Sequence, residues 1–504
     1  MLLTDSATMK EADRNAIELY DIPSTELMEN AAEAVASTAV KFLAREERAV
    51  VFSSTGNNGG DGIAAACNLI QEGFSVSVYL IGNREKMTAD TREMAQRLYA
   101  LGGEILDFPD DGKIWIDFSG VGVIVDALFG IGLNRPLEGA ALRAVQMINS
   151  SGVPVVSCDI ASGVDADTGA ILGDAVRASV TVTFSMAKVG HFASPGCACC
   201  GELCIVDIGI PGEFVTGCGI RAVMPEDLSI SPRKRDAHKG DFGKLLVVGG
   251  SVGYTGAPTL CAKAALRTGA GLVSIGVPDA IYGITAMKND EAMPFPLAAD
   301  SSGRLSVDAI PAIQEKLSGM NALVLGPGLG RSADVTKLVF RMVMESEQPL
   351  VLDADALNAL AENTDILLAA KSLCILTPHE GEFARLLGRP VENRIGDAFE
   401  FAMRYKCIVV LKGQATVIAY PTREIYLNTS GSPALAKGGT GDVLSGVIAA
   451  MLCRLPAREA VITAVWLHGR AGDICEERFG ENGVLATDVI HAIPEAMQEI
   501  SERK

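Results

Sequence analysis

The sequence predicts an α/β protein with two layered domains, and three observations support this fold class. Short apolar runs that indicate strands alternate with segments rich in helix-forming residues along the chain. The alternation stops in a polar stretch near residues 220–230 and then begins again. The chain also has 504 residues, whereas a single hydrophobic core stops growing at about 250–300 residues. Continuous apolar strands separated by helices are typical of parallel sheets covered on both faces.

The first half is predicted to contain a helix followed by repeats of strand and helix. Residues 27–43 are rich in Ala and Glu, which are good helix formers. The predicted strands are short, apolar and followed by loops, and they are residues 49–52, 75–81, 121–128, 153–160, 179–184 and 203–208. In sheets of this kind, ligands bind in the loops at the carboxyl ends of the strands.

A change in composition predicts where the first half ends. Pro211 and Gly212 follow its last strand, and residues 233–239 are mostly basic. This basic run could be a charged patch for a nucleotide, but a solvated linker is the favoured interpretation. The two domains are therefore predicted to span residues 1–220 and 225–504.

The second half repeats the alternation and ends with two strands that suggest a β-hairpin. Its predicted strands are residues 245–249, 272–277, 322–325, 350–353, 373–376, 408–411, 416–419 and 424–427. Its predicted helices are residues 258–268, 335–344, 397–405, 442–455 and 457–479.

The charge and hydropathy of the chain exclude several classes of function. There are 43 Lys and Arg against 62 Asp and Glu, a net charge of −19. Such a chain repels phosphate backbones and anionic lipid surfaces, so we expect no nucleic-acid or membrane partner. No apolar stretch reaches the length of about 18 residues that a membrane span needs, and no signal peptide is evident. The sequence thus predicts a cytoplasmic protein, and we expect a homo-oligomer because parallel-sheet enzymes often self-associate.

The twelve cysteines do not indicate a disulfide scaffold in a chain of this length. Most lie in apolar runs and are predicted to be buried thiols of a reducing compartment. Cys197, Cys199, Cys200 and Cys204 form a cluster downstream of His191. A metal site there lacks a second paired arm to complete a tetrahedron, so buried or turn residues are the favoured interpretation.

Glycine is unusually frequent, at 53 of 504 residues, and its distinctive clusters follow strands. The first cluster reads GNNGGDG at residues 56–62, between a strand and a helix. This arrangement directs backbone N–H groups and a helix dipole at an anion. A tight turn without a ligand is the alternative interpretation. The Asn and Asp oxygens of the loop would also suit a cation.

Two further loops of the first half begin with an aspartate at the end of an apolar strand. They read DALFGIGLNRP from Asp126 and DIASGVDADTG from Asp159. A single aspartate at such a place is often only a helix cap. Three loops from one sheet converge on one edge, however, and capping alone does not require that convergence.

In the second half, GGTGD at residues 438–442 begins a long apolar helix. The N–H groups of this turn can stabilise a transferring phosphate, and Asp442 is then placed to act as a base toward a hydroxyl. The alternative is that Asp442 is only a first-turn carboxylate favoured by the helix dipole. His379 in TPHEGE could be structural or contact a ligand. Lys412 in KGQAT could bind phosphate or be a solvated cation.

The loops of the first half, together with VTFSMAKVGHF and VDIGIP, resemble the epimerase domain of the NAD(P)H-hydrate repair enzymes. The resemblance implies a Rossmann-like three-layer domain that interconverts the R and S epimers of hydrated NADH or NADPH. It implies that Asp159 contacts the reactive nicotinamide end and that Asn58, Asp126 and Ser162 bind potassium. It also implies the residues that hold the hydrate, which are Asn57, Asn58, Gly59, Gly60, Asp61, Gly130, Ile131, Gly132, Leu133, Asn134, Arg135, Pro136 and Asp159. One departure is Ala161, where the family usually has Pro.

The second half resembles the ribokinase-like ADP-dependent NAD(P)H-hydrate dehydratases, through TPHEGEF, KGQAT and GTGDVLSG. The resemblance implies a ribokinase-like α/β domain that removes water from the S hydrate while ADP is converted to AMP and phosphate, with Mg²⁺ accompanying ADP. The residues implied to bind the hydrate are Ala257, Gly328, His379 and Asp442. Those implied to bind the adenosine nucleotide are Lys412, Gly413, Gln414, Ala415, Thr416 and Gly441.

Together the two resemblances imply a bifunctional isomerase and lyase that acts on hydrated NADH and NADPH with ADP. Two alternatives stay open. The GTGDVLSG motif is shared with sugar and vitamin kinases, so the chain could be a small-molecule kinase. Domains similar to the first half also occur as binding scaffolds without catalysis, although the intact Asn58, Asp126 and Asp159 argue against this.

Overall fold

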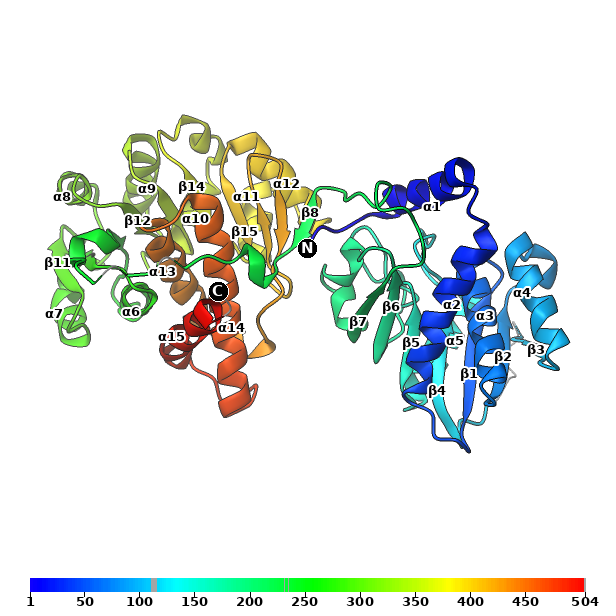
Figure 1. Ribbon diagram of the computed structural model, residues 1–504. Helices are drawn as coiled ribbons and strands as arrows, with labels where there is room; N and C mark the ends of the chain where they lie inside the picture. The colour runs from blue at the N-terminus through cyan, green and yellow to red at the C-terminus, as the bar shows by residue number, and fades with distance from the viewer. Residues whose placement is uncertain (110–115, 231, 234, 503–504) are drawn as a thin grey trace. The chain divides into compact units, whose positions relative to one another are not determined.

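The computed structural model describes residues 1–109, 116–230, 232–233 and 235–502. It divides into an N-terminal unit, Leu2–Ile220, and a C-terminal unit, Arg221–Lys504, which also contains Met1 (Figure 1). Ser231 and Lys234 of the predicted linker lie outside the described residues. No helix in the described part of the chain is long and apolar enough to span a bilayer.

A seven-stranded sheet forms the middle layer of the N-terminal unit. Its order is β3-β2-β1-β4-β5-β6-β7, and every neighbouring pair is parallel. The strands are β1 (Arg48–Ser54), β2 (Ser75–Ile81), β3 (Ile105–Asp107), β4 (Val121–Ala127), β5 (Val155–Cys158), β6 (Val180–Phe184) and β7 (Glu202–Val206). The chain runs from β1, the third strand in this order, to one edge, then crosses over to β4 and continues to the other edge, as in Rossmann-like sheets.

Helices cover both faces of this sheet because successive side chains of a strand point to opposite faces. Ala49 and Val51 of β1 pack in one core with helices of one layer, whereas Val50 and Phe52 pack in a second core with α5. The helices are α1 (Ser6–Tyr20), α2 (Ser24–Val40), α3 (Asn57–Gln71), α4 (Ala89–Ala100) and α5 (Gly139–Ser150). Figure 1 shows α2, α3 and α4 together on one face. The predicted three-layer Rossmann-like fold is confirmed.

A ten-stranded sheet forms the middle of the C-terminal unit, in the order β11-β10-β9-β12-β13-β14-β15-β16-β17-β8. The pairs from β11 to β15 are parallel, and β16 pairs antiparallel with both β15 and β17, which confirms the predicted hairpin. The strands are β8 (Ile220–Ala222), β9 (Lys244–Val248), β10 (Leu272–Pro278), β11 (Met293–Leu297), β12 (Ala322–Leu325), β13 (Leu350–Leu352), β14 (Cys374–Leu376), β15 (Ile408–Leu411), β16 (Val417–Ala419) and β17 (Ile425–Leu427).

One core of this unit packs one face of the sheet against its longest helices. Leu245 and Val247 of β9 meet residues of α6, α13, α14 and α15 in that core. Helices α6 and α13 approach closely at Gly446, where a Cβ atom would lie 2.1 Å from the Cys261 carbonyl oxygen. The helices are α6 (Ala257–Thr268), α7 (Asp279–Lys288), α8 (Ile310–Leu317), α9 (Ala333–Glu345), α10 (Asp355–Leu360), α11 (Glu380–Leu387), α12 (Arg394–Tyr405), α13 (Thr440–Leu452), α14 (Ala457–Phe479) and α15 (Ala486–Glu502).

Among the boundaries that differ from the sequence prediction, two have a clear local cause. Strand β5 ends at Cys158 rather than at Ile160, because Asp159 adopts a left-handed conformation with φ of 64°. Helix α13 begins at Thr440, two residues before the predicted start, directly after Gly439 with φ of 98°. Both residues leave the β and right-handed helical regions, so each ends or begins an element.

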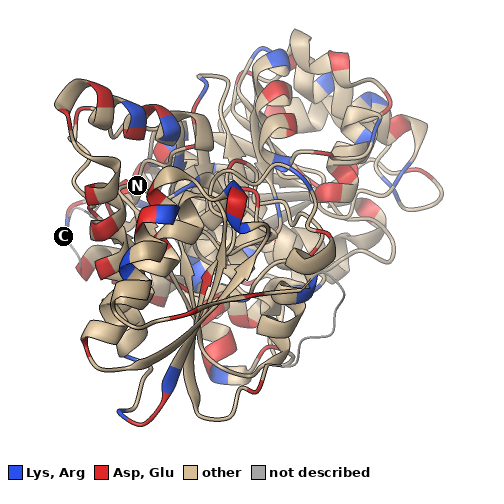
Figure 2. Cartoon of the chain, turned by 90° about the vertical axis from the view of Figure 1, so that its right-hand side faces the viewer, with Lys and Arg blue, Asp and Glu red and all other residues tan. Residues whose placement is uncertain are grey.

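The acidic surplus does not separate from the basic residues on the surface. Figure 2 shows Asp and Glu interspersed with Lys and Arg along the helices. Several of them form ion pairs between or within helices, such as Arg97 with Glu29 and Glu93, and Arg470 with Glu499. Exposed pairs of this kind contribute at most about 1 kcal/mol each to stability.

Candidate active sites

A cavity of about 620 Å³ lies in the N-terminal unit at the carboxyl ends of its strands. It is lined by residues of the loop after β1, the loop after β4 and the end of β5, which are three of the predicted loops. The predicted site residues that line it are Asn57, Asn58, Asp61, Gly130, Ile131, Gly132, Leu133 and Asp159. The structure thus brings residues from all three loops to one concave surface.

Gly130 allows two of these loops to approach each other. A Cβ atom on Gly130 would lie 2.9 Å from Asn58 Oδ1 and 3.4 Å from Asp159 Oδ2. The first distance is shorter than a carbon atom tolerates without a shift of its neighbour. A side chain at this position would therefore push the amide of Asn58 away from Gly130 and crowd the carboxylate of Asp159.

The carboxylate of Asp159 forms an ion pair that the sequence did not predict. Lys188, which follows β6, places Nζ 2.5 Å from Asp159 Oδ1, and Thr183 Oγ1 also donates to that oxygen at 3.1 Å. Burial raises the pKa of Asp159, but the charge and hydrogen bond of Lys188, together with His191 and Thr183, outweigh burial and hold the pKa below its usual value. Asp159 is therefore a carboxylate at neutral pH, with a buried ammonium directly beside it.

His191 fixes the backbone around this ion pair. Its Nδ1 accepts a hydrogen bond from the Lys188 amide at 3.0 Å, and its Nε2 lies 2.9 Å from the Asp159 carbonyl oxygen. Burial and the nearby Lys188 lower the pKa of His191 to about 4, so the ring is neutral. With Nδ1 as the acceptor, the neutral ring carries its proton on Nε2 and donates it to Asp159.

Two more carboxyl groups line the same cavity. Asp13 comes from α1, and burial and the charge of Asp159 raise its pKa to about 6. Burial, Asp159 and Asp13 together raise the pKa of Asp61 well above its usual value. The cavity therefore holds one ionised carboxylate beside Lys188 and two carboxyl groups that retain protons at higher pH than usual. Sequence reasoning named Asp61 but missed Asp13, which lies far from the glycine loops in the sequence.

The other predicted hydrate contacts lie elsewhere. Gly59 and Gly60 are buried in the first turn of α3, where a Cβ atom on Gly59 would lie 2.0 Å from the Ser54 carbonyl oxygen. These glycines let α3 begin directly against the end of β1 rather than lining the cavity. The remaining three predicted contacts are exposed and do not line the cavity; they are Asn134, Arg135 and Pro136.

Two of the three predicted potassium ligands are in direct contact. Ser162 Oγ donates to Asp126 Oδ1 at 2.6 Å, and the Ser162 amide donates to Oδ2 at 2.9 Å. Asp126 is fully buried, and no Lys or Arg in the described part of the chain pairs with it. The third predicted ligand, Asn58, has a buried amide nitrogen without a hydrogen-bond partner. Ala161, where a Pro was expected, is fully buried in the same loop and leaves Ser162 in place.

In the C-terminal unit, Asp442 lies in the first turn of α13. The amides of a helix's first turn have no partner within the helix, so this end can receive an anion. Burial and the neighbouring Asp353 raise the pKa of Asp442 to about 7, against the opposing effect of Lys412. A carboxyl group with this pKa is half ionised near neutral pH, which suits a general base.

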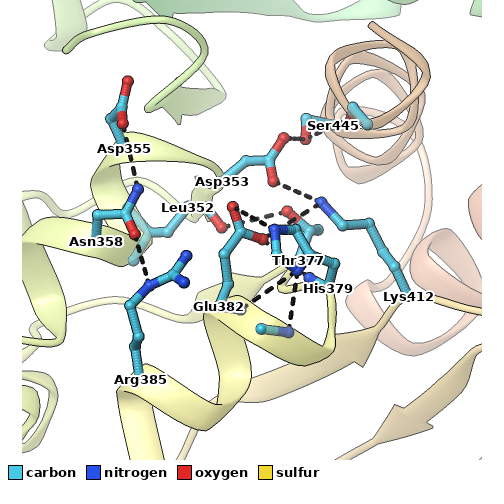
Figure 3. Close-up of polar contacts among 12 residues, drawn as sticks. Leu352, Asp353, Asp355, Asn358, Thr377, His379, Glu382, Arg385, Lys412 and Ser445 are labelled. Atoms are coloured by element: carbon cyan, nitrogen blue, oxygen red, sulfur yellow. Dashed lines mark hydrogen bonds and ion pairs between the residues drawn. The ribbon is translucent and has the colours of Figure 1, made fainter. Parts of the chain in front are cut away.

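A polar network lies beside the start of α13 (Figure 3). Lys412, at the end of β15, places Nζ 3.0 Å from Asp353 Oδ1 and 3.9 Å from Glu382 Oε2. A Cβ atom on Gly441 would lie 3.3 Å from the same Nζ. Lys412 and Gly441, both predicted to bind the nucleotide, are thus brought together. Glu382 lies in the TPHEGE motif and Asp353 ends a predicted strand, but the sequence predicted no role for either residue.

The loop that follows Lys412 is held by a residue that the sequence did not single out. Arg394, at the start of α12, donates to the carbonyl oxygens of Gln414 at 2.9 Å and of Lys412 at 3.3 Å. Thr416 Oγ1 donates to the Gly413 carbonyl oxygen at 3.0 Å, and Ala415 adopts a left-handed φ of 52°. The predicted nucleotide loop is therefore a defined turn fixed by one guanidinium.

The predicted hydrate contacts of this unit fall into two groups. His379 caps α11 and forms a β-bridge with Lys412, and 57% of its side chain is exposed. Gly328 lies at the end of β12 with φ of 66°, where its Cβ position is 3.3 Å from that of Ala257 at the start of α6. His379 therefore lies on the same side as the nucleotide loop, and Ala257 lies beside Gly328.

The thiols of the cysteine cluster in the N-terminal unit are buried or half-buried. Within the described ranges, no group of three or more His, Cys, Asp and Glu is placed to hold a metal ion. All twelve cysteines are free thiols, and most of them are buried, as predicted. Burial raises the pKa of Cys200 to about 12, which keeps its thiol protonated.

Comparison with known proteins assigns each half of the chain to a described family. Residues 245–495 match the family model described as NAD(P)H-hydrate dehydratase, and residues 24–190 match the model described as YjeF-related protein N-terminus. A solved structure of the ADP/ATP-dependent NAD(P)H-hydrate dehydratase from Bacillus subtilis, co-crystallized with ATP/Mg²⁺, is 30% identical. It covers 56% of this chain and 100% of its own, with a TM-score of 0.47.

Full-length relatives combine both halves in one chain. The bifunctional NAD(P)H-hydrate repair enzyme Nnr of Thermofilum pendens is 38% identical over 98% of this chain and 96% of its own length. The enzyme of the same name from Moorella thermoacetica is 36% identical over 100% of this chain and 98% of its own. The chain belongs to the family of bifunctional NAD(P)H-hydrate repair enzymes.

Proposed function

We propose that the N-terminal unit interconverts the R and S epimers of hydrated NADH and NADPH. The C-terminal unit then dehydrates the S form while ADP is converted to AMP and phosphate. The observation that carries the second reaction is Asp442, a carboxyl group with a pKa of about 7 in the first turn of α13. The observation that carries the first is the Asp159–Lys188 ion pair on the wall of the 620 Å³ cavity.

The dehydration follows from the leaving groups involved. Hydroxide leaves a carbon atom poorly, whereas phosphate leaves well. Asp442 takes the proton of the C6 hydroxyl as its oxygen attacks the β-phosphate of ADP, and the bond to AMP breaks. The phosphate ester then leaves C6, pushed by the lone pair of the ring nitrogen, and loss of a proton from C5 restores the double bond. Amides at the start of α13 and the Lys412 ammonium stabilise the charge on the transferring phosphate.

The epimerisation requires that the C6 centre of the hydrate lose and regain its configuration. Asp159 offers a proton acceptor and Lys188 a proton donor on one wall of the cavity, 2.5 Å apart. A substrate hydroxyl at this wall could exchange its hydrogen bonds with both groups. Asp61 and Asp13, with their raised pKa values, are neutral donors over a wider pH range than ordinary carboxylates.

Asn58, Asp126 and Ser162 fit a potassium ion by the chemistry of their donor atoms. Buried charges in proteins are normally paired or coordinate a metal, and Asp126 meets only uncharged donors among the described residues. A bound potassium ion would supply the missing positive charge and order the loops after β4 and β5. We expect Mg²⁺ to accompany ADP through the nucleotide phosphates, since these commonly carry it.

An assay with the R and S hydrates of NADH and NADPH tests both reactions. Appearance of NADH absorbance with AMP and free phosphate, dependent on ADP, supports the dehydration. A stable phosphorylated acceptor would support a kinase instead. Conversion of the pure R hydrate to the S form without ADP supports the epimerisation, and no acceleration by the intact chain would favour a binding scaffold. Omission of K⁺ tests whether the epimerisation requires it, and omission of Mg²⁺ tests whether the dehydration requires it.

A further inference from the structure

Asp353 is the most buried carboxylate of the polar network beside α13. It lies directly after β13, and its side chain is 2% exposed. Its Oδ1 accepts a hydrogen bond from Lys412 Nζ at 3.0 Å, and its Oδ2 accepts one from Ser445 Oγ at 2.8 Å. Figure 3 shows Asp353 between these two side chains, with one oxygen directed at each.

These two partners belong to the two parts of the proposed dehydratase site. Lys412 begins the nucleotide loop after β15, and Ser445 lies on α13, three residues after Asp442. Residues three apart on a helix lie on nearly the same face. One buried carboxylate therefore joins the nucleotide loop to the helix that carries the proposed base.

The ion pair with Asp353 also fixes the position of the Lys412 ammonium. The ammonium is drawn to Asp353 at 3.0 Å and to Glu382 at 3.9 Å, and it comes within 3.3 Å of the Cβ position of Gly441. The amides at the start of α13 and this ammonium therefore face the same space. A phosphate bound there would meet the helix dipole and a fixed cation together.

We propose that Asp353 is a positioning residue for the C-terminal reaction, which holds the Lys412 ammonium beside Gly441 and keeps negative charge next to Asp442. The inference rests on the proposed function, in which the ADP phosphates bind at the start of α13. Asp353 itself does not touch the substrate in this scheme, because both of its oxygens are occupied by Lys412 and Ser445.

The charges around Asp442 give the proposal a measurable consequence. Burial has the largest effect on the pKa of Asp442; Asp353 and Asp355 also raise this pKa, and Lys412 lowers it. Two titratable groups beside α13, Cys261 and His468, carry no charge near neutral pH. Burial raises the pKa of the Cys261 thiol on α6, and burial lowers that of His468 on α14 to about 4. Asp353 and Lys412 should therefore shift the titration of Asp442 in opposite directions.

The test compares Asp353→Asn and Lys412→Gln in the full chain. The pH dependence of kcat for ADP-dependent dehydration of the S hydrate is measured between pH 5 and 9. In the wild type, the rate should rise through pH 7 as Asp442 loses its proton. Asp353→Asn should move this rise to lower pH and Lys412→Gln should move it to higher pH, each by about one unit or more. The matched control is Asp308→Asn, at an exposed position far in sequence from both Asp353 and Asp442. It should leave the pH profile unchanged.

Each outcome decides the proposal. Shifts of opposite sign support it. If both variants fold, as judged by calorimetry, and the rise stays at the wild-type pH, Asp353 has only a structural role and the proposal is overturned. If Asp353→Asn does not fold, Lys412→Gln alone decides, because an unmoved or lowered rise contradicts the proposal. A wild-type enzyme without ADP-dependent dehydration refutes the proposed function instead, which separates that failure from a failure of the inference.

Discussion

Lys188 and Asp159 are 29 residues apart in sequence, yet Lys188 Nζ lies 2.5 Å from Asp159 Oδ1 on the wall of the N-terminal cavity. Lys188 is 1% exposed, so nearly all of its charge is removed from bulk water. Such a cation is retained only with good partners, and it has three: Asp159 Oδ1, Thr183 Oγ1 at 2.9 Å and the Phe184 carbonyl oxygen at 3.1 Å.

Replacing Lys188 by Met should therefore abolish epimerisation while dehydration of the S hydrate continues. The loss of a positioned proton donor costs about 10²–10⁴-fold in rate. The unpaired Asp159 should also lower the free energy of unfolding by about 3–5 kcal/mol. The rate of R-to-S conversion measures the first effect and urea unfolding measures the second. Lys86→Met, at an exposed position outside the cavity lining, serves as the control. Unchanged epimerisation in Lys188→Met would exclude Lys188 from the reaction.

Replacing Asp442 by Asn should nearly abolish ADP-dependent NADH formation and leave epimerisation intact. The substitution keeps the size of the side chain but removes the base, so kcat should fall by about 10²–10⁴-fold with a smaller change in KM. NADH absorbance and AMP release measure the first reaction, and R-to-S conversion measures the second. Undiminished dehydration in this variant would contradict the assignment of Asp442 as the base.

The same substitution should stabilise the protein at high pH. In the unfolded chain Asp442 titrates near pH 3.9, whereas in the folded chain its pKa is about 7. Between these values the folded state holds a proton that the unfolded state has lost, so the stability due to this group falls as pH rises toward 7. At pH 8 the free energy of unfolding of Asp442→Asn should exceed that of the wild type by no more than about 4 kcal/mol, at about 1.4 kcal/mol per pKa unit, and the variant should unfold at a higher temperature. The difference in stability between the variant and the wild type should vanish at pH 4. An equal difference at pH 4 and pH 8 would argue against a buried charge on Asp442.

Potassium should raise the thermal stability of the N-terminal unit through Asp126. A ligand that binds only the folded state stabilises it in proportion to the logarithm of its concentration above Kd. The unfolding temperature should therefore rise with KCl but not with equal choline chloride, which controls for ionic strength. Asp126→Asn should remove this difference, because the buried charge that attracts the cation is gone. A rise that persists in the variant would place the cation elsewhere.

The close approach of α6 and α13 predicts a strong effect of one methyl group. Gly446→Ala places a Cβ atom 2.1 Å from the Cys261 carbonyl oxygen, so the two helices must separate, at a cost of about 1–3 kcal/mol or more. Gly283→Ala, on α7, meets nothing within 4 Å and its φ is not positive. That control should be neutral or stabilising by up to about 1 kcal/mol, because Ala favours a helix over Gly. Urea unfolding compares the two variants, and equal stabilities would mean that the helices can part without cost.

The sequence predicts the central strands well because they are buried on both faces. Val50 and Val51 must both be apolar, so β1 is visible as a continuous apolar run. Strand β11 was missed because Pro294 and Pro296 argue against a central strand, and the structure places it at the edge of the sheet, where proline is tolerated. Helix α1 was missed although Asp5 caps it, since its charged residues gave no clear apolar stripe.

The candidate sites were only partly predictable for a related reason. Asn58, Asp159 and Asp442 lie in loops whose glycines mark strand ends, so local sequence draws attention to them. Lys188 and Asp353 act through partners 29 and 59 residues away, and only the folded chain shows which carboxylate meets which ammonium. The homo-oligomeric state stays a prediction.

The twelve free thiols make the fold accessible to a chemical measurement of its motions. Burial raises the pKa of Cys261, Cys374 and Cys407, and all three side chains are buried in the C-terminal unit. An alkylating reagent reacts with a thiolate in contact with water. A buried thiol can therefore react only after the surrounding sheet and helices transiently separate. The labelling rate of each cysteine therefore reports the free energy of the opening that exposes it, without any introduced probe. Addition of ADP should slow labelling at Cys261, which lies on the helix packed against α13, if the nucleotide holds that region closed.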